Sequence, residues 1–431
     1  MQYSLLYEIR ADAMTNAKIK LSIFINFFLF AILLNSVGTV ILQSQRYFGV
    51  LAASAAMLEV FKDIGLGVVS FIIASFITRI GYKNSMLAAV GVITVACFLV
   101  PLFKTFLAVK ILFALSGSCF ALLKISIFST LGLIAKNERA HISLMNFIES
   151  FFMIGILCGY FLFSRYIDDG NASSDNWFSV YYILGAFSAV CFLVLWLAPL
   201  NESAIGRKSQ TVVQGEFFSM LKLMAAPLIM SFMASIFLYT LIEQSIMCWL
   251  PTFNHKQLQL SSGLSVMMTG ILAFAIATGR LFTGIIIKKV SWYKALLFCL
   301  AAVFLLVMIT LPFAMREEAG QSGVPVAAYI FPLIGFFMAP VYPVINSIML
   351  SSLPKDKQAM TAGLIVVFSS IGGMSGSLIT GYIFQSYGGK TAFYFSLLPV
   401  AVLAAVLFIL KKAKEKAWRY DRYKNLEMAM V

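Results

Sequence analysis

The sequence has little charge for its length and few residues that bind metals. Only 12% of its 431 residues are charged, against about 25% in soluble globular chains. Two His and six Cys are scattered without a CxxC pair, so we expect no disulfide, no metal site and no cofactor. The chain also lacks a nucleotide-binding loop, an HExxH motif and a nucleophile elbow, so no catalytic residue is proposed and an enzyme is not expected.

Long apolar stretches take the place of charge, and 61% of the residues are hydrophobic. A hydrocarbon core about 30 Å thick needs about 20 apolar residues for each helical crossing. The pattern therefore predicts an all-α membrane protein whose twelve crossings lie near residues 21–43, 49–78, 85–103, 106–134, 142–166, 177–199, 223–251, 262–287, 294–314, 324–352, 358–385 and 390–411.

The placement of the cations argues against nucleic acid as a partner, despite a net charge of +14. With twelve crossings, most of the Lys and Arg residues fall on one side of the membrane. The opposite loops hold only Arg46, Lys104, Arg165, Lys256, Arg316 and Lys390. The positive-inside rule then predicts a multi-pass protein of the cell inner (plasma) membrane with both termini cytoplasmic. The first helix follows no cleavage pattern, so we expect it to be retained.

The predicted domains are a cytoplasmic N-terminus (1–20), a six-helix bundle (21–199), a cytoplasmic linker (200–222), a second six-helix bundle (223–411) and a basic tail (412–431). The tail carries aromatic residues among its cations, which is typical of an anchor on anionic membrane lipids, with a partner-binding site as the alternative. Similar cationic turns, TRIGYK at 78–83 and KKVSWYK at 288–294, follow the second helix of each half. This repetition indicates two related halves.

Several motifs resemble those of the major facilitator superfamily. SFITRIGYK (75–83) resembles its loop 2–3 signature, without the usual acidic residue; Lys110 stands where the superfamily usually has Arg; and GRLFTG (279–284) is similar to its helix 8 pattern. TLIEQSIMCWLPTF (240–253) and APVYPVINS (339–347) look like segments of the fucose permease and glucose/galactose porter group. The resemblance implies two pseudo-symmetric six-helix bundles, a solute site between them and alternating access.

The chain departs from the fucose permease at the residues that would define its chemistry. Asn35-Ser36 stands where that permease has Asn-Asp, Lys124 where it has Glu, and Glu149 where it has Asn. Two carboxylates of that family are therefore absent. Neither its sugar nor its proton site can be transferred to this chain by resemblance.

Lys124 and Glu149 are the first candidate site residues. A charge at the bilayer centre costs about 2.5 to 3.5 kcal/mol on insertion scales, so it persists only beside a partner or a water-accessible cavity. Lys124 lies about 15 Å and Glu149 about 10 Å from the predicted inner ends of their helices. We expect the two to pair when no solute is bound, with Glu149 taking up a proton when a solute anion binds Lys124. A permanent salt bridge that fixes helix packing is the alternative.

A second group of candidate solute ligands comes from both halves. It consists of Glu243, Gln244, Asn35, Tyr239 and Asn346. Glu243 is expected to be unpaired and, with Glu149, to couple proton movement to transport. Polar residues satisfied within the core are the alternative for this group.

Five further charged residues are assigned to gating: Glu59, Lys62, Asp63, Arg79 and Arg280. The first three are spaced i, i+3 and i+4, so they share one helical face in the outer third of the predicted membrane. A hydrated face or an extracellular gate would account for them. Arg280, near the inner end of its helix, is expected to be a cytoplasmic-gate or packing residue.

The function predicted from these features is a secondary active transporter for a small polar solute, anionic or zwitterionic, driven by protons. Partners are then a small-molecule substrate, protons and lipids, and the protein is expected to be a monomer. A proton-driven exporter of amphipathic compounds and a sugar/proton symporter are the alternatives of similar type. A channel or scramblase is the alternative of a different class.

Overall fold

The computed structural model describes residues 2–73, 77–134, 138–200, 202, 227–286, 290–316, 325–351 and 355–429. Over these ranges the chain is helical and has no strand. It forms two compact units. Unit 1 consists of Met1–Ser209, Leu250–His255 and Leu260–Ala273, and unit 2 consists of Gln210–Trp249, Lys256–Gln259 and Phe274–Val431.

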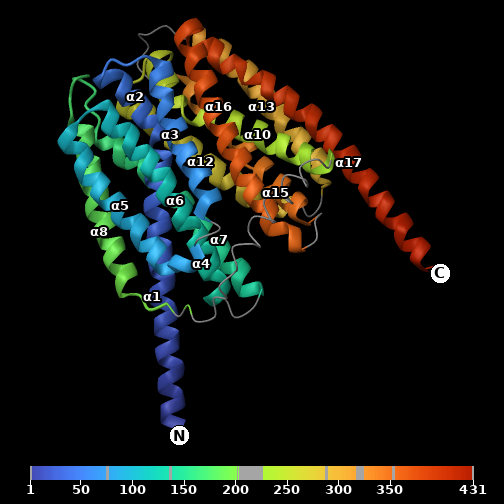
Figure 1. The fold of residues 1–431 in the computed structure, drawn as a ribbon. Helices are drawn as coiled ribbons and strands as arrows, with labels where there is room; N and C mark the ends of the chain where they lie inside the picture. Colours follow the sequence, from blue (N-terminus) through green and yellow to red (C-terminus); the bar gives the residue numbers. More distant parts are fainter. Residues whose placement is uncertain are drawn as a thin grey trace. The chain divides into compact units, whose positions relative to one another are not determined.

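Unit 1 contains the helices of the first half of the chain. They are α1 (Gln2–Asn35), α2 (Val37–Tyr47), α3 (Ala52–Ile73), α4 (Ile77–Ile80), α5 (Tyr82–Phe103), α6 (Phe106–Ile134), α7 (Glu138–Tyr166), the short helix η1 (Asn176–Phe178) and α8 (Ser179–Leu197). Extensively packed pairs are α3 with α6, α5 with α6, and α1 with α7. The pair α5 and α8 lies side by side in Figure 1. Most of α11 (Leu250–Lys256) and the first part of α12 (Ser262–Ile286) also belong to unit 1.

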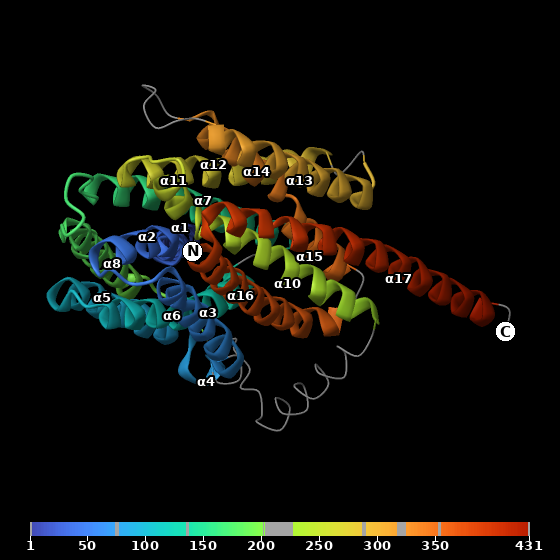
Figure 2. The same cartoon turned by 90° about the horizontal axis from the view of Figure 1, so that it is seen from above.

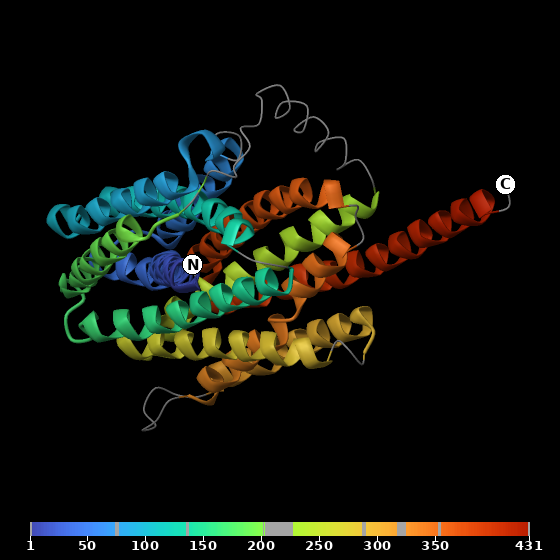
Figure 3. The ribbon, with the colours of Figure 1, turned by 90° about the horizontal axis from the view of Figure 1, so that it is seen from below.

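Unit 2 contains α10 (Pro227–Met247), the rest of α12, α13 (Trp292–Arg316), α14 (Val326–Met338), α15 (Val341–Ser351), α16 (Lys355–Phe395) and α17 (Leu397–Ala429). The helix α10 packs along α16 (Figure 2). The helices α13 and α14 lie side by side (Figures 2 and 3).

The twelve predicted crossings are confirmed. Within the described ranges, nine segments are long and apolar enough to span a membrane. The last of these, Leu364–Glu415, contains a turn at Gly388 with φ of +84°, a conformation that favours glycine, so it supplies two crossings. Phe151–Tyr166 is a shorter apolar helix, and α3 has the length of a crossing but contains three charged residues. The architecture is an all-α membrane protein with twelve transmembrane helices.

Within the described residues, four crossings are interrupted along their length, and the twelfth breaks at Ser396 between α16 and α17. The first breaks at Ser36 between α1 and α2, and the seventh breaks at Cys248 and Trp249 between α10 and α11. The tenth breaks between α14 and α15, where Pro340 has no backbone N–H to donate. The first and seventh crossings open the two halves of the chain, so their matching breaks agree with a repeated architecture. Broken helices of this kind are common at transport sites.

Close helix contacts depend on small residues. A Cβ added at Gly117 of α6 would overlap the carbonyl oxygen of Lys62 in α3. A Cβ added at Gly376 of α16 would overlap the carbonyl oxygen of Leu241 in α10. These glycines therefore let the two backbones approach to direct contact, as small residues do between membrane helices.

Candidate functional site

Three charged residues of α3 form a buried cluster, here called the α3 triad. The Nζ atom of Lys62 lies 2.6 Å from Oε1 of Glu59 and 3.7 Å from Oδ1 of Asp63. The exposed fractions of Glu59, Lys62 and Asp63 are 0%, 5% and 5%. Within the described part of the chain, the second carboxylate oxygen of Glu59 has no hydrogen-bond partner. One ammonium therefore serves two carboxylates in an apolar environment.

The burial of the α3 triad corrects the expectation of a hydrated face. The i, i+3, i+4 spacing placed the three residues on one face correctly, but that face is enclosed by protein because α3 packs closely on α6. Along α3 from Ala52, Glu59 and Asp63 lie about 10 and 17 Å deep, within a hydrocarbon core about 30 Å thick. A gating role for these residues stays a prediction.

Lys124 lies within an aromatic cluster. Its Nζ atom is 5.7 Å from the ring centroid of Phe120 and 5.6 Å from that of Phe128, one turn to either side on α6. Phe27 of α1 contacts the same two rings, at 5.5 and 6.3 Å between centroids. An ammonium near aromatic faces gains about 0.5 to 2 kcal/mol, which is less than a desolvated charge requires.

The predicted ion pair between Lys124 and Glu149 is not formed. Among the ion pairs of the described residues, none joins these two side chains. The side chain of Glu149 is exposed on α7, while Lys124 is partly buried between its aromatic neighbours. Counting residues gives the height of a side chain along its helix, but it does not give the direction in which the helix turns that side chain.

Unit 2 has a polar cluster on α10 and α12, here called the Glu243 cluster. Tyr239 donates its hydroxyl hydrogen to Oε1 of Glu243 at 2.8 Å, and Nη2 of Arg280 lies 3.7 Å from the same oxygen. Tyr239 is 1% exposed, whereas the side chains of Glu243 and Arg280 are 20% and 30% exposed. The expectation that Glu243 is unpaired is therefore wrong. Arg280 lies beside this carboxylate, and its gating role stays a prediction.

Helix α15 presents two polar residues, Tyr342 and Asn346, one turn apart on one face. The ring of Tyr342 lies 5.6 Å from that of Tyr239, and its hydroxyl lies 3.3 Å from Oγ of Ser369. Asn346 has a buried Oδ1 atom without a hydrogen-bond partner in the described residues. A buried amide oxygen without a partner can accept a hydrogen bond from a solute or a water molecule.

Asn35 and Gln244 are bonded within their own helices. Asn35 donates to the carbonyl of Ala31 at 2.9 Å, and Oε1 of Gln244 lies 3.3 Å from the thiol sulfur of Cys248. Asn35 lies directly before the break at Ser36 in the first crossing, and Gln244 lies one turn before the break at Cys248 in the seventh. Their predicted role as solute ligands stays a prediction.

The turn between α4 and α5 has an acidic partner that the sequence motif lacks. Glu202 accepts a hydrogen bond from the backbone N–H of Lys83 at 2.6 Å, at the start of α5. The ammonium of Lys83 donates to the carbonyl of Trp196 at 2.9 Å. Glu202 thus supplies an acceptor for one backbone N–H and places a negative charge at a helix N-terminus, where it is favourable. The side chain of Arg79 lies outside the described residues.

At the end of unit 1 away from the α4–α5 turn, polar contacts join the loops. These contacts were not predicted from the sequence. Lys104 donates to the carboxylate of Asp175, and this hydrogen bond lowers the pKa of Asp175 and raises the pKa of Lys104. Asp169 accepts a hydrogen bond from the backbone N–H of Gly263 at 2.9 Å. These residues lie far apart in the sequence, and no motif joins them.

Comparison with known proteins decides the family. The sequence model of the Major Facilitator Superfamily matches residues 21–376 and 322–423. The chain belongs to the major facilitator superfamily. As predicted from its motifs, this transporter-family protein also resembles the fucose permease: the Escherichia coli fucose:proton symporter FucP matches with a TM-score of 0.61 and 15% identity, over 91% of this chain and 98% of that one.

This superfamily member is also similar to curated proteins. It is 23% identical over 398 residues to the Protein TsgA homolog of Buchnera aphidicola subsp. Baizongia pistaciae, covering 90% of this chain and 92% of the relative. It is 29% identical over 118 residues to the sialic acid transporter NanX of Escherichia coli, covering 26% of this chain and 28% of the relative. The family and the fold together identify a multi-pass membrane protein of a solute-transporter family.

Proposed function

We propose that the protein is a secondary active transporter that carries a small polar solute with an anionic or zwitterionic group, coupled to protons, by alternating access. The observation that carries this proposal is Lys124. Its ammonium lies about 15 Å from the end of α6, near the bilayer midplane. It has no carboxylate within ion-pair distance in the described part of the chain.

An uncompensated ammonium at this depth is stable only if water or an anion reaches it. The neighbouring rings of Phe120 and Phe128 lower its cost but cannot replace a counterion. A solute carboxylate would supply the missing charge, with the aromatic faces contacting the apolar part of the solute. The similarity to NanX, whose name gives an acid as its cargo, agrees with this solute class.

Proton coupling is supported by carboxylates that lie within the crossings. The α3 triad has two carboxylates and one ammonium, so its charges balance when one proton is bound. Glu243 faces Arg280 at 3.7 Å and remains partly exposed, so a change in that distance would alter its affinity for a proton. Glu149, exposed on α7, is the third candidate.

The remaining parts of the proposal concern the membrane in which the protein resides, its orientation and its oligomeric state. The protein is proposed to reside in the inner (plasma) membrane as a monomer, with the termini and the linker at 200–222 in the cytoplasm. The distribution of Lys and Arg between the loops supports this orientation. Asn35, Gln244, Tyr239 and Asn346 are proposed as further polar contacts for the solute.

The test begins with the purified protein and a thermal-stability screen against carboxylates, zwitterionic amino acids, siderophore-like anions and neutral sugars, each at acidic and neutral pH. We expect stabilisation by one class of acids or zwitterions. The stabilising compound is then supplied to proteoliposomes with an imposed proton gradient, where saturable uptake and countertransport are expected. Stabilisation by neutral sugars alone, without pH dependence, would overturn the proposed solute class.

Two matched variants connect the result to Lys124. Lys124→Met should abolish uptake of the stabilising compound, whereas Lys110→Met should leave it unchanged. Lys110 is a suitable control because it lies on the same helix and its ammonium also contacts an aromatic ring, that of Phe106, at 4.5 Å. Wild-type uptake by Lys124→Met, at equal amounts of folded protein, would contradict the proposal.

A further inference from the structure

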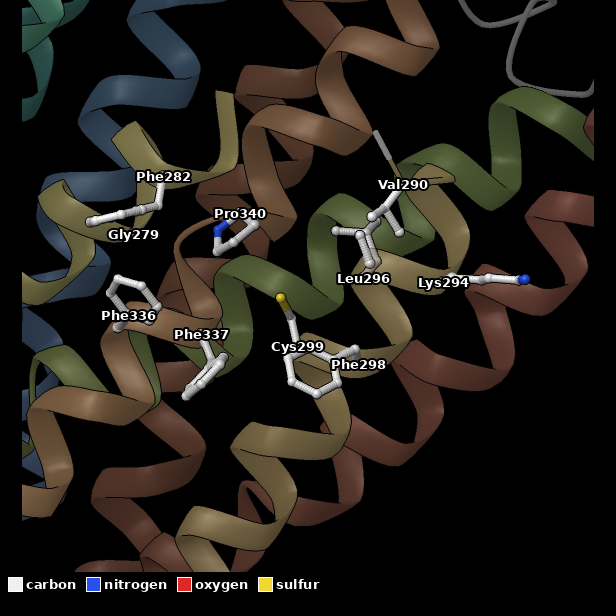
Figure 4. Close-up of a pocket in the computed structure, with 11 residues that line it drawn as sticks. Gly279, Phe282, Val290, Lys294, Leu296, Phe298, Cys299, Phe336, Phe337 and Pro340 are labelled. Atoms are coloured by element: carbon white, nitrogen blue, oxygen red, sulfur yellow. The ribbon is translucent and has the colours of Figure 1, made fainter. Parts of the chain in front are cut away.

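Unit 2 has an apolar cavity that the proposed transport function does not use. Its volume is about 300 Å³, and it lies between α12, α13 and α14 (Figure 4). Its lining includes the rings of Phe282, Phe298, Phe336 and Phe337, and Gly279 and Pro340 lie away from Lys294. Two of these rings, Phe282 and Phe298, are 53% and 66% exposed, so the cavity opens onto the outer surface of the unit. In a membrane-spanning unit that surface faces lipid.

The cavity extends from the end of a crossing towards its middle. At one end lies Lys294, in the first turn of α13. At the other end lies Pro340, about 16 Å along the tenth crossing from Ser351, the end that shares a side with Lys294, and therefore deep in the hydrocarbon. An elongated apolar space that runs inward from the interface has the orientation of a lipid acyl chain.

The outer end of the cavity is cationic. Lys294 is the only charged residue of its described lining, and its ammonium points away from the apolar side chains, towards α17 (Figure 4). There the Nζ atom of Lys411 lies 4.8 Å from the ring of Tyr293, and that of Lys414 lies 5.9 Å from the ring of Trp292. Trp and Tyr are typical of the membrane interface, and basic residues beside them attract anionic headgroups.

We propose that this cavity binds one anionic phospholipid, with an acyl chain along Phe282, Phe298 and Phe337 and the phosphate beside Lys294, Lys411 and Lys414. The charge of the outer end and the apolar character of the inner end match the two parts of this molecule. A polar transported solute matches only the outer end. In the proposed orientation, this end faces the cytoplasmic leaflet, whose anionic lipids attract such clusters.

The position of the cavity means that a bound lipid would affect how α12 packs on α14. Its inner end contacts Gly279, whose α-carbon touches the backbone of Phe336 in α14 so closely that an added Cβ would overlap the carbonyl. The next residue, Arg280, is the partner of Glu243. A bound acyl chain therefore supports the α12–α14 contact that holds Arg280 in place.

Native mass spectrometry of the purified full-length protein tests the site, with phosphatidylglycerol and phosphatidylcholine added separately in detergent. The wild type should retain one phosphatidylglycerol more tightly than phosphatidylcholine. Lys294→Gln should weaken phosphatidylglycerol binding by about fivefold, the effect expected for one interfacial lysine, and leave phosphatidylcholine binding unchanged. Ala295→Trp, which fills the cavity, should weaken binding of both lipids.

Lys390→Gln is the matched control, because Lys390 is a half-buried lysine of the same unit outside the cavity lining. It should bind both lipids as the wild type does. The proposal is overturned if the wild type has no preference for phosphatidylglycerol, if Lys294→Gln and Lys390→Gln weaken it equally, or if a second copy of the chain rather than lipid is retained. Lys294→Gln alters a side chain at the cavity rim, so it keeps the test decisive should Ala295→Trp fail to fold.

Discussion

The ammonium of Lys62 lies 2.6 Å from Oε1 of Glu59, one turn away on α3, and both side chains are almost completely buried in unit 1. Asp63 lies on the other side of the same ammonium, at 3.7 Å. The attraction between the ammonium and the two carboxylates offsets part of the cost of burying the three groups, and loss of the ammonium would leave two buried carboxylates without a counterion. The arrangement therefore makes Lys62 the residue on which the stability of the α3 triad depends.

Lys62→Met should destabilise the protein by about 3 to 5 kcal/mol, the usual cost of leaving a buried charge without its partner. The loss should be smaller at acidic pH, because protons can then neutralise Glu59 and Asp63. Thermal unfolding in detergent at acidic and neutral pH measures both effects. The triple variant Glu59→Gln, Lys62→Met, Asp63→Asn should recover much of the stability, and an equal loss at both pH values would contradict the explanation.

The Glu243 cluster predicts energetic coupling between α10 and α12. Glu243→Gln and Arg280→Met should each destabilise the protein, because each leaves a partly buried charge without its partner. In the double variant, the two effects should fall short of their sum by about 0.5 to 3 kcal/mol, as expected for residues in contact. A double-mutant cycle of thermal unfolding measures this coupling. Strict additivity would show that the 3.7 Å contact contributes nothing.

The sequence was informative where a physical rule acts locally. Apolar length predicted the crossings, including α3 with its three charged residues, and the i, i+3, i+4 spacing predicted that the α3 triad shares a face. It could not predict that this face is enclosed, because enclosure depends on Gly117 bringing α6 against Lys62. Nor could it predict the rotation of α6 that turns Phe120 and Phe128, and with them Lys124, towards Phe27 of α1.

Contacts between distant segments were equally inaccessible to sequence reasoning. Arg280 and Glu243 lie on different helices, and their predicted depths in the membrane suggested separate roles. Glu202 lies beyond α8 and reaches the start of α5 across more than a hundred residues. No local pattern of residues encodes either contact, because each depends on how whole helices pack.

Gly376→Ala should destabilise unit 2 by about 1 to 3 kcal/mol, the usual cost of overpacking, because the added methyl group would overlap the backbone of Leu241. Gly91→Ala is the matched control: its added Cβ would meet the ring of Phe192 at 3.5 Å, an ordinary contact. In an α-helix that substitution should be neutral or stabilising. Thermal unfolding of the two variants provides the comparison, and an equal effect on both would refute the close contact of α10 and α16.

The pair of Lys104 and Asp175 predicts a small effect that depends on pH. The hydrogen bond from Lys104 holds the pKa of Asp175 below its ordinary value of 3.8. Because the pKa is lower in the folded than in the unfolded protein, the stabilisation exists above 3.8 and is lost as the pH falls through the folded value. Lys104→Ala should therefore be slightly less stable than the wild type at neutral pH. Thermal unfolding should give equal stability in strong acid, and a difference that grows there would reverse the sign of this argument.

The last prediction concerns Glu202. Two variants of this residue distinguish the effect of its charge from the effect of its hydrogen bond. Its carboxylate accepts from the backbone N–H of Lys83 and lies close to Gly81, the residue before α5, whose φ is +88°. Glu202→Ala should cost about 0.5 to 2 kcal/mol, the range for loss of a helix N-terminal cap. Glu202→Gln keeps an acceptor oxygen but removes the charge that favours a helix N-terminus, so it should cost about 0.3 to 1 kcal/mol.

Thermal unfolding of the two Glu202 variants distinguishes these contributions. The control is Glu415→Gln, since Glu415 is an exposed carboxylate whose contact with Lys411 spans 3.9 Å on a helix surface. Such exposed pairs contribute little, so the control should match the wild type. If Glu202→Ala also matches the wild type, the carboxylate does not hold the α4–α5 turn. In that case the acidic group missing from the loop 2–3 signature has no substitute at Glu202.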